Sequence, residues 1–490
     1  MKNLLSPRTG IELAGSIKSW LAALAAAPLL AASGFAAEPP NIVFIMVDDM
    51  GWADIGIYGS EATQTPNLDR MAEQGIRFTE AYSGSSLCAP ARSTLLTGQH
   101  TGRTPVRGNL GGTPLPADAV TWSGILQDAG YTIGGFGKWG LGEIGTSGVP
   151  EDHGFDEFFG YYHQVHAHTF YPTHLYRNSE RVDLPGNADF RPRGSGPIRH
   201  ETNGPELQYT HYEIFERTLE FIRENRDGPF VCYAPWTPPH RAWHIPEHDP
   251  AWQLYKDENW PVAARVFAAM NTMLDRHTGE VIALLEELGI ADRTLVIFTS
   301  DNGAAERWDG TLDSSGPLRG RKIALYEGGI RVPFIAYWPG RIEPGQVSDL
   351  LTYFPDMMPT FAELAGVPEL VPEDRDGISI VPTLLGAEAA GREQATHDFL
   401  YWENATNDYR QQTYRWPETL TQAARIGDWK AYREDPEADI ELYDLSNDIG
   451  EENDVAGDHP DLVARFARIF EEESRPLSGD QNYNPQRVRN

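Results

Sequence analysis

The stretch Asn41-Ile-Val-Phe-Ile-Met-Val47, followed by Asp48-Asp49, decides the fold class of this 490-residue chain. An unbroken apolar run of this length is typical of a strand that is buried on both faces, as the strands of parallel sheets are. The same composition recurs at residues 131–136, 229–234 and 294–300, and residues 332–337 are similar. These five segments are the expected strands of one central sheet.

Helical patterns separate the expected strands. Residues 65–75 carry a proline near their start and end at a glycine, which is how many helices begin and stop. Residues 262–288 carry apolar side chains near helical spacing. Strands that alternate with helices predict an α/β fold, in which a large domain has a mixed, mostly parallel central sheet flanked by helices.

The composition changes near Leu385. Short strand candidates and one helix candidate follow around Leu400, Ala424 and Trp429 and at residues 441–444 and 460–473. We therefore expect a catalytic domain at residues 37–385 and a small C-terminal α+β subdomain with an antiparallel sheet at residues 386–490.

The first 36 residues have the pattern of a secretory signal peptide. Lys2, Arg8 and Lys18 accompany an apolar stretch at residues 20–32, and Gly34-Phe35-Ala36 offers the small residues that a signal peptidase reads. The alternative is an uncleaved anchor, but the stretch is shorter than the roughly 20 residues that a spanning helix needs. Cleavage after Ala36 would give a periplasmic or secreted protein. No stable membrane insertion is expected, because no other run is long enough to span a bilayer.

The charge balance excludes one class of protein. The chain has 40 Lys and Arg residues against 71 Asp and Glu residues, a formal charge of −31. A nucleic-acid-binding protein needs a basic face to meet phosphate, so no nucleic-acid partner is expected. Lysine is scarce, since only Lys138, Lys256, Lys322 and Lys430 follow the predicted signal peptide.

Polar side chains stand beyond the ends of four expected strands. Asp48-Asp49 follow the first strand, Lys138 the second and Asp301-Asn302 the fourth, while Pro235 leads from the third to His240. Ligands of open α/β sheets bind beyond the carboxyl ends of the strands. Three carboxylates and one amide oxygen suit Ca²⁺ or Mg²⁺ better than zinc. The alternative for each Asp is a helix cap or a turn.

A distinctive segment surrounds Cys88: Ser85-Ser-Leu-Cys-Ala-Pro-Ala-Arg-Ser-Thr-Leu-Leu-Thr-Gly98. Pro90 is favourable in the first turn of a helix, so a helix at residues 91–96 is expected to direct its positive end at Cys88. From the residues alone, Cys88 is a low-pKa reactive thiol or a packed cysteine. A disulfide with Cys232, the one other cysteine, is a further alternative for an exported protein, which the surroundings of Cys88 disfavour.

These motifs resemble those of the type I sulfatases, a family of the alkaline phosphatase superfamily. The family signature is Cys-x-Pro-x-Arg, then Ser or Thr, ending in Thr-Gly, and it is matched by Cys88, Pro90, Arg92, Ser93, Thr97 and Gly98. The Asp48-Asp49, Lys138 and Asp301-Asn302 motifs and Lys322-Ile-Ala-Leu-Tyr-Glu-Gly-Gly329 stand in the family's order. The resemblance covers residues 41–472 and implies an alkaline-phosphatase-like fold and hydrolysis of sulfate esters.

The resemblance implies that a maturation enzyme oxidises Cys88 to formylglycine, whose hydrated aldehyde carries two hydroxyls. One hydroxyl attacks sulfur and expels the alcohol, and deprotonation of the other then releases sulfate, which is covalent catalysis with a built-in release step. The resemblance also implies one Ca²⁺ per chain. Its ligands would be Asp48, Asp49, Asp301, Asn302 and the modified Cys88.

The resemblance assigns a role to each neighbouring charged side chain. Arg92 would stabilise the ionised diol, and Lys138 and Lys322 would neutralise charge that develops on the sulfuryl oxygens. His240 would protonate the leaving oxygen as a general acid. The alternative for His240 is a structural histidine on a proline-rich loop.

The chain departs from the family at one position. Many relatives read Gly-Lys-x-His after the second strand, with that His as the base for sulfate release, whereas this chain reads Gly137-Lys138-Trp139-Gly140. We expect His166 or His168 to reach the site as the base or as a sugar contact. The alternative is that both histidines order the surrounding loop.

The expected substrate is a sulfated sugar or polysaccharide fragment, and the sequence does not identify the sugar. Five tryptophans are expected either to stack on sugar rings or to pack inside the domain: Trp236, Trp243, Trp252, Trp308 and Trp402. Four arginines are candidates for an arginine-lined cleft: Arg103, Arg107, Arg319 and Arg321. Two other functions are alternatives, namely a phosphodiesterase or phosphonate monoester hydrolase of the same superfamily, and a non-catalytic glycan-binding descendant with Cys88 unmodified.

Overall fold

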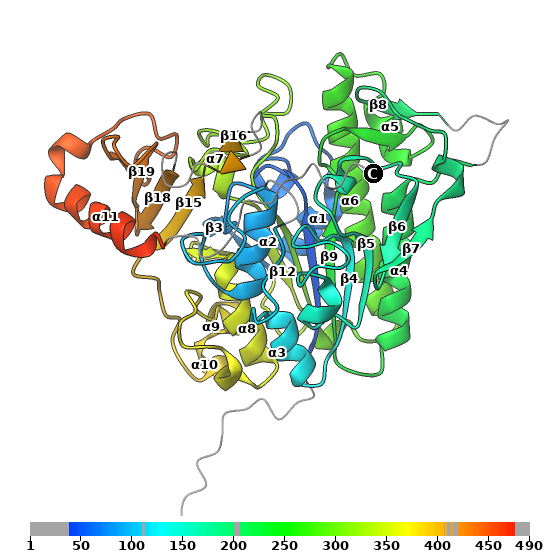
Figure 1. Ribbon diagram of the computed structural model, residues 1–490, viewed down its shortest axis with the longest axis horizontal. Helices are drawn as coiled ribbons and strands as arrows, with labels where there is room; N and C mark the ends of the chain where they lie inside the picture. The colour runs from blue at the N-terminus through cyan, green and yellow to red at the C-terminus, as the bar shows by residue number, and fades with distance from the viewer. Residues whose placement is uncertain are drawn as a thin grey trace, which may run out of the picture. The chain divides into compact units, whose positions relative to one another are not determined.

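The central sheet has ten strands in the order β13-β2-β12-β11-β1-β9-β4-β5-β6-β7 (Figure 1). The computed structural model describes residues 39–109, 113–199, 206–405, 407–408, 413–414 and 420–475, so the predicted signal peptide at residues 1–36 lies outside the described residues. The described residues belong to one compact unit, Phe35–Asn490. The strands of the sheet are β1 (Asn41–Val47), β2 (Ile76–Phe78), β4 (Thr132–Lys138), β5 (Glu157–Tyr161), β6 (His174–Arg177), β7 (Glu180–Asp183), β9 (Phe230–Trp236), β11 (Thr294–Ser300), β12 (Phe334–Tyr337) and β13 (Gln346–Ser348).

The predicted α/β fold with a mixed, mostly parallel sheet is confirmed. Strand β1 lies between β9 and β11 and runs parallel to both, and β4 runs parallel to β9 and β5. The four apolar runs predicted as parallel strands are therefore β1, β4, β9 and β11. The apolar run of β1 follows from this central position, because every one of its seven residues is buried.

The fifth predicted strand, β12, differs in direction, because it runs antiparallel to β11. A parallel neighbour would require the chain to cross back to the opposite edge of the sheet after β11. The segment between the two strands stays at the carboxyl edge of β11, where the Lys322 amide donates to the Ala304 carbonyl. The chain therefore re-enters the sheet from the edge at which β11 ends. Apolar composition alone does not encode that direction.

Two layers of helices cover the sheet. Phe44 of β1 faces the layer that contains α2, α3 and α8, and its ring lies 5.9 Å from that of Phe361. Val43 of the same strand faces the layer that contains α1, α4 and α6. The helices of the unit are α1 (Pro66–Glu73), α2 (Cys88–Thr97), α3 (Trp122–Asp128), α4 (Thr210–Asn225), α5 (Pro250–Tyr255), α6 (Val262–Glu287), α7 (Glu327–Ile330), α8 (Met357–Leu364), α9 (Val381–Leu385), α10 (Ala387–Ala390) and α11 (Pro460–Glu473).

A separate antiparallel sheet follows in the C-terminal part, with strand order β15-β18-β19-β20, and α11 packs against it (Figure 1). Its strands are β15 (Leu400–Ala405), β18 (Leu420–Ile426), β19 (Trp429–Arg433) and β20 (Glu441–Asp444). The remaining strands form pairs: β3 (Ala81–Tyr82) with β14 (Thr352–Tyr353), β8 (Gly196–Ile198) with β10 (His244–Pro246), and β16 (Asn407–Asp408) with β17 (Thr413–Tyr414). The predicted antiparallel sheet and the helix at residues 460–473 are confirmed. The domain boundary at residue 385 stays a prediction.

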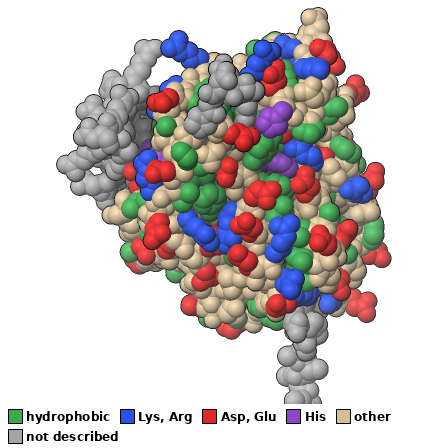
Figure 2. Space-filling model, turned by 90° about the vertical axis from the view of Figure 1, so that its right-hand side faces the viewer, with side chains coloured by type: hydrophobic (Ala, Val, Ile, Leu, Met, Phe, Trp, Pro, Cys, Tyr) green, Lys and Arg blue, Asp and Glu red, His purple; other side chains and the backbone are tan. Residues whose placement is uncertain are grey.

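Acidic side chains are spread over the face drawn in Figure 2 and alternate with Lys and Arg, so the net negative charge is not gathered there in one patch. Within the described part of the chain, no helix combines the length and apolarity that a bilayer crossing requires.

Candidate active site

The predicted strand ends meet at one edge of the sheet. Val47 is level with Ser300 of β11 and with Trp236 of β9, so the residues that follow β1 and β11 emerge side by side. Asp49 adopts a left-handed backbone conformation with a φ of 72°, and its amide donates to Asp301 Oδ1 at 3.2 Å. The structure thus brings Asp48-Asp49 and Asp301-Asn302 together, as the sequence predicted.

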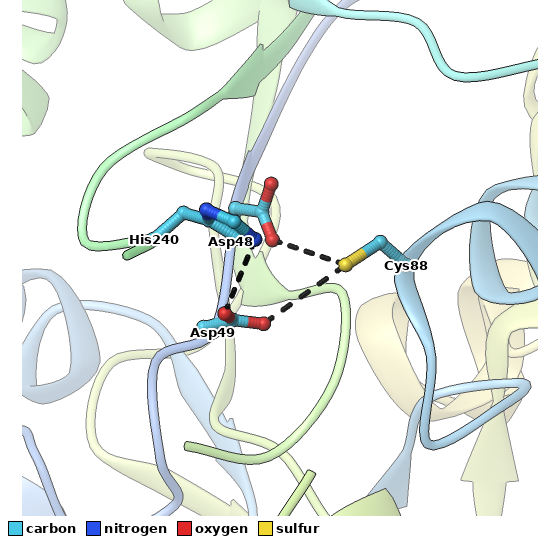
Figure 3. Close-up of side chains that lie close together, drawn as sticks. All are labelled: Asp48, Asp49, Cys88 and His240. Carbon is cyan, nitrogen blue, oxygen red and sulfur yellow. Dashed lines mark hydrogen bonds and ion pairs between the residues drawn. The ribbon is translucent and has the colours of Figure 1, made fainter. Parts of the chain in front are cut away.

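Cys88 points toward Asp48 and Asp49 from one side of this cluster (Figure 3). It is the first residue of α2, so the helix begins three residues earlier than the sequence predicted. The Cys88 Sγ donates to Asp48 Oδ1 at 3.3 Å, and the Lys322 ammonium donates to the sulfur at 3.1 Å. The residue is fully buried, and both Cys88 and Cys232 are free thiols, so the alternative of a disulfide is not realised.

The unmodified thiol is not activated. Burial, together with the nearby carboxylates of Asp301 and Asp48, raises the pKa of Cys88 to about 12. These effects exceed the opposing influence of Lys138 and Lys322. The alternative of a low-pKa reactive cysteine, suggested by its place at a helix N-terminus, is therefore wrong for this structure.

Ion pairs fix the acidic residues of the site. Lys138 Nζ lies 2.5 Å from Asp48 Oδ2, and the side chains of both residues are fully buried. Arg92 Nη2 lies 2.7 Å from Asp301 Oδ2, and Lys322 Nζ lies 2.5 Å from Asp49 Oδ1. Burial alone would raise the pKa of Asp48, but Lys138 and the other cations hold it well below its ordinary value. Two of the scarce lysines are thus placed by buried carboxylates.

The same residues can hold a cation. Ligand atoms of Asp48, Asp49, Cys88 and His240 lie within 4.8 Å of one another. Asp49 Oδ2 and Asn302 Oδ1 are buried and lack hydrogen-bond partners, so both oxygens are available as ligands of a cation. Burial raises the pKa of Asp49, although Lys322 opposes this effect. The raised pKa means that the ionised carboxylate is destabilised by desolvation, and a bound cation would stabilise it.

The donor set fits a hard cation such as Ca²⁺, because its unpartnered atoms are carboxylate and amide oxygens. Both carboxylate oxygens of Asp301 have partners, as those of Asp48 do. Asp301 Oδ2 binds Arg92 and Asp301 Oδ1 accepts the Asp49 amide, while burial raises the pKa of Asp301 to about 6.

The predicted histidines divide into two groups. His240 Nε2 lies 3.6 Å from Asp49 Oδ2, and the His168 ring stacks on the His240 ring at 4.8 Å between centroids. The His166 ring instead contacts Tyr161 and His174, with ring centroids 5.2 and 4.6 Å away. The structure therefore brings His168, and not His166, against a predicted catalytic side chain.

Gly140 lies against Gln164, so a side chain at this position would displace the Gln164 amide. A Cβ on Gly140 would lie 2.7 Å from Gln164 Oε1, and its φ of +79° disfavours any side chain. Gln164 is 1% exposed and its Oε1 has no hydrogen-bond partner, while its Nε2 donates to Asn109 Oδ1 at 2.7 Å. Asn109 Oδ1 also accepts the amide of Ala89, next to Cys88. Sequence reasoning missed Gln164 and Asn109, because single amides far apart in the chain give no motif.

The tryptophans and arginines proposed as sugar contacts have other partners. Trp236, Trp243, Trp252 and Trp402 are buried, and Trp308 is half-buried with its ring 4.8 Å from that of Trp243. The alternative of packing is therefore correct for them. The four arginines bind protein groups: Arg103 binds Asp376 and Glu473, Arg107 binds Glu403, Arg319 stacks on Tyr326, and Arg321 binds the Ala305 carbonyl. These guanidinium groups therefore have protein partners, and the arginine-lined cleft stays a prediction.

The sequence matches known proteins over most of its length. It matches the family model described as "Sulfatase" over residues 40–367 and the one described as "N-sulphoglucosamine sulphohydrolase, C-terminal" over residues 321–472. N-acetylgalactosamine-6-sulfatase of Rattus norvegicus is 36% identical over 395 residues, which cover 74% of this chain and 69% of that protein. Arylsulfatase A of Homo sapiens is 33% identical over 476 residues, which cover 90% and 89%.

Among solved structures, the crystal structure of Ps i-CgsB in complex with k-i-k-neocarrahexaose is similar to this chain. The TM-score is 0.73 at 25% sequence identity, and the match covers 90% of this chain and 94% of that chain.

Proposed function

The chain belongs to the sulfatase family of sulfuric ester hydrolases, and we propose that its substrate is a sulfated sugar, cleaved with a formylglycine formed from Cys88 and a bound Ca²⁺. One observation carries this proposal. Cys88 lies fully buried between Asp48 and Lys322 at the carboxyl edge of the sheet, beside two oxygen acceptors without hydrogen-bond partners. A cysteine that served packing alone would not need buried carboxylate and ammonium groups around it, because burial of charged groups is costly.

The missing groups would supply the two reactive parts of the chemistry. Formylglycine would provide a hydroxyl nucleophile and a second hydroxyl for release of sulfate. A Ca²⁺ held by Asp48, Asp49, Asp301 and Asn302 would polarise the sulfate.

The cationic side chains of the chain would stabilise the sulfuryl group. Lys138 and Lys322 both lie at buried carboxylates within the site, and both are ammonium groups that can turn toward developing negative charge. Arg92 is held by Asp301 and by the Lys138 carbonyl, so its planar group has a fixed orientation at the nucleophile. We assign to Arg92 the positioning of the nucleophile and to the lysines the neutralisation of sulfate.

His240 is the proposed donor of a proton to the leaving oxygen. Burial lowers its pKa well below the ordinary value, although Asp48 opposes this effect, so the imidazole is neutral at pH 7 without substrate. A bound sulfate ester adds negative charge, which favours the protonated imidazole. His240 would therefore acquire its proton only once the substrate is in place.

The sugar assignment rests on the relatives. Those compared above include an N-acetylgalactosamine-6-sulfatase and a protein whose crystal structure holds k-i-k-neocarrahexaose. Sulfated N-acetylgalactosamine is therefore the first sugar to test. We further propose export after cleavage of a signal peptide at Ala36, and maturation of Cys88 by a formylglycine-generating enzyme.

Two measurements on the wild-type protein test the proposal. Mass spectrometry of the peptide that contains Cys88 should show the mass loss of formylglycine, and the same preparation should hydrolyse an aryl sulfate. An unmodified thiol together with no turnover would support the non-catalytic glycan-binding alternative. Faster turnover of an aryl phosphate than of the aryl sulfate would support the phosphodiesterase alternative.

A pair of lysine variants tests the site. Lys138→Met should lower kcat for the aryl sulfate by about 10²–10³-fold, the usual cost of removing one group that stabilises transition-state charge. Lys256→Met is the matched control, because Lys256 is exposed and its ammonium donates to Gln253 alone among the described contacts. Equal rates for both variants would refute the assignment of Lys138.

A further inference from the structure

A cavity of about 480 Å³ lies beside the candidate active site. Its wall comes from the loop between β5 and β6, from the segment before β8, and from the chain just after His240. The residues that line it are His166, His168, Thr169, Tyr171, Pro172, Thr173, His174, Phe190, Arg191, Pro192, Gly194, Ala242 and His244. Its volume falls in the usual range for small-molecule sites.

The cavity shares a wall with the candidate active site. His168 lines the cavity and stacks on His240, with an angle of 22° between the rings. Ala242 and His244 follow His240 closely in the sequence and also line the cavity. His240 lies on the side of the site where the leaving oxygen of the substrate would be protonated. The cavity is therefore on the side of the alcohol, not of the sulfate.

The charge of the lining differs from that of the chain. No Asp or Glu is among the lining residues, although the protein has 71 of them, and Arg191 is the one Lys or Arg. The Arg191 guanidinium already donates to the Asn187, Ala188 and Phe190 carbonyls. The cavity thus presents neither a carboxylate that would repel a sulfated chain nor a free cation that would demand an anion.

Two residues that line the cavity carry buried polar groups without hydrogen-bond partners. Tyr171 is 2% exposed and its hydroxyl has no hydrogen-bond partner. His244 is also 2% exposed, and its ring nitrogens lack well-formed hydrogen bonds, although the Gly194 backbone lies near. The Tyr171 and Phe190 rings meet edge to face at 5.3 Å between centroids. Buried polar atoms without partners mark places where a ligand supplies the missing hydrogen bonds.

We propose that this cavity binds the sugar residue next to the sulfated one, so that the protein acts on sulfated oligosaccharides in preference to free sulfated monosaccharides. The inference rests on the proposed function. A sugar ring offers hydroxyls that both donate and accept, which suits a phenol and imidazoles, and apolar C–H faces, which suit aromatic rings.

The test compares substrates of different size. The panel contains sulfated N-acetylgalactosamine, glucosamine and galactose, each as the monosaccharide and as the terminal residue of a tetrasaccharide, with an aryl sulfate as the size-independent reference. For the wild-type protein, the tetrasaccharide form of the best sugar should have the higher kcat/KM. The ratio of its kcat/KM to that of the aryl sulfate is the readout.

Tyr171→Phe removes only the unpartnered hydroxyl and should lower this ratio about three- to tenfold, through KM, as expected for one lost hydrogen bond. Tyr432→Phe, in β19 of the C-terminal sheet, controls for the loss of a phenolic hydroxyl and should leave the ratio unchanged. Thr173→Trp fills the cavity from its half-buried rim and should lower the ratio further, which keeps the test decisive if Tyr171→Phe does not fold.

The outcomes separate the two proposals. Hydrolysis of neither the aryl sulfate nor any sulfated sugar of the panel refutes the proposed function and the inference together. An aryl sulfate that is hydrolysed, with no tetrasaccharide turned over or with ratios unchanged in Tyr171→Phe and Thr173→Trp, overturns the inference and leaves the sulfatase reaction intact.

Discussion

Lys430→Met is expected to destabilise the protein strongly, although Lys430 lies outside the candidate active site. Lys430 Nζ lies 2.9 Å from Glu327 Oε1 and 2.8 Å from Glu451 Oε1, and all three side chains are fully buried. Glu327 begins α7, five residues after Lys322, and its amide donates to Glu451 Oε2 at 2.8 Å. The ammonium of β19 therefore joins the C-terminal sheet to the segment that carries Lys322.

The magnitude follows from the charges that remain. Arg331 also binds Glu327, at 3.1 Å, so the variant leaves two buried carboxylates with one neighbouring cation fewer. Removal of one partner from a buried ion pair costs about 3–5 kcal/mol, because the other partner stays desolvated and unpaired. In the wild-type protein, burial raises the pKa of Glu451 against the influence of Lys430, so Glu451 is the carboxylate closest to protonation.

The pH dependence distinguishes this explanation from a simple packing defect. Without Lys430, Glu327 and Glu451 have higher pKa values in the folded state than they have in the folded wild-type protein. The folded variant therefore binds more protons, relative to its unfolded state, than the wild-type protein does. Its stability relative to wild type is therefore best preserved at low pH and falls as pH rises. The free energy of unfolding from urea titrations at pH 5.5 and pH 8 measures this difference.

Two further variants complete the experiment. Glu451→Gln added to Lys430→Met should recover part of the loss at pH 8, because it removes one uncompensated charge. Lys256→Met on the exposed surface should change the free energy of unfolding by no more than about 0.5 kcal/mol. A Lys430→Met protein as stable as wild type at pH 8, or a loss of equal size at both pH values, would refute the reasoning.

Three further predictions concern other parts of the structure. His397 Nε2 lies 2.8 Å from Asp356 Oδ1; burial alone would lower its pKa, but Asp356 raises it, so its stabilisation is complete below about pH 6.5 and is lost as pH rises through the raised value. His397→Asn should therefore flatten the urea midpoint between pH 6 and pH 8; an unchanged slope would contradict this. Gly145→Ala should cost about 1–2 kcal/mol for its positive φ alone, whereas Gly140→Ala should cost about 1–3 kcal/mol more, because its Cβ also meets a side chain; equal losses in thermal denaturation would argue against the clash. Addition of Ca²⁺ at 100 times its Kd to chelator-treated protein should stabilise it by about 2.7 kcal/mol. In Asn302→Ala, the same Ca²⁺ concentration should raise the melting temperature less than in the wild-type protein. A wild-type melting temperature that does not depend on Ca²⁺ would speak against the site.

The strand ends were the most predictable part of the molecule. The run from Asn41 to Val47 is apolar because both faces of β1 are covered, and the fold rule for parallel sheets then places Asp48-Asp49 beside Asp301-Asn302. The direction of β12 was not predictable from the same pattern, because burial on both faces is common to parallel and antiparallel strands inside a sheet.

Side-chain contacts between distant segments were the least predictable. Gln164 occupies the space beside Gly140 because the β5–β6 loop returns across the end of β4, and no local spacing encodes that return. The scarcity of lysine was informative in a way that the motifs were not. Lys430 matches no signature, yet it is as deeply buried as Lys138 and is likewise held by carboxylates.

The burial of Cys88 bears on when the proposed modification of this residue could take place relative to folding. No solvent reaches the thiol, and Lys322, which stands 234 positions later in the chain, donates to its sulfur. Another enzyme's active site cannot enclose a residue in that state. An enzyme that oxidises Cys88 must therefore meet the chain while the segment around Lys322 is still unmade or unfolded. Under the proposed maturation, Cys88 would therefore be modified after its synthesis and before Lys322 packs against it.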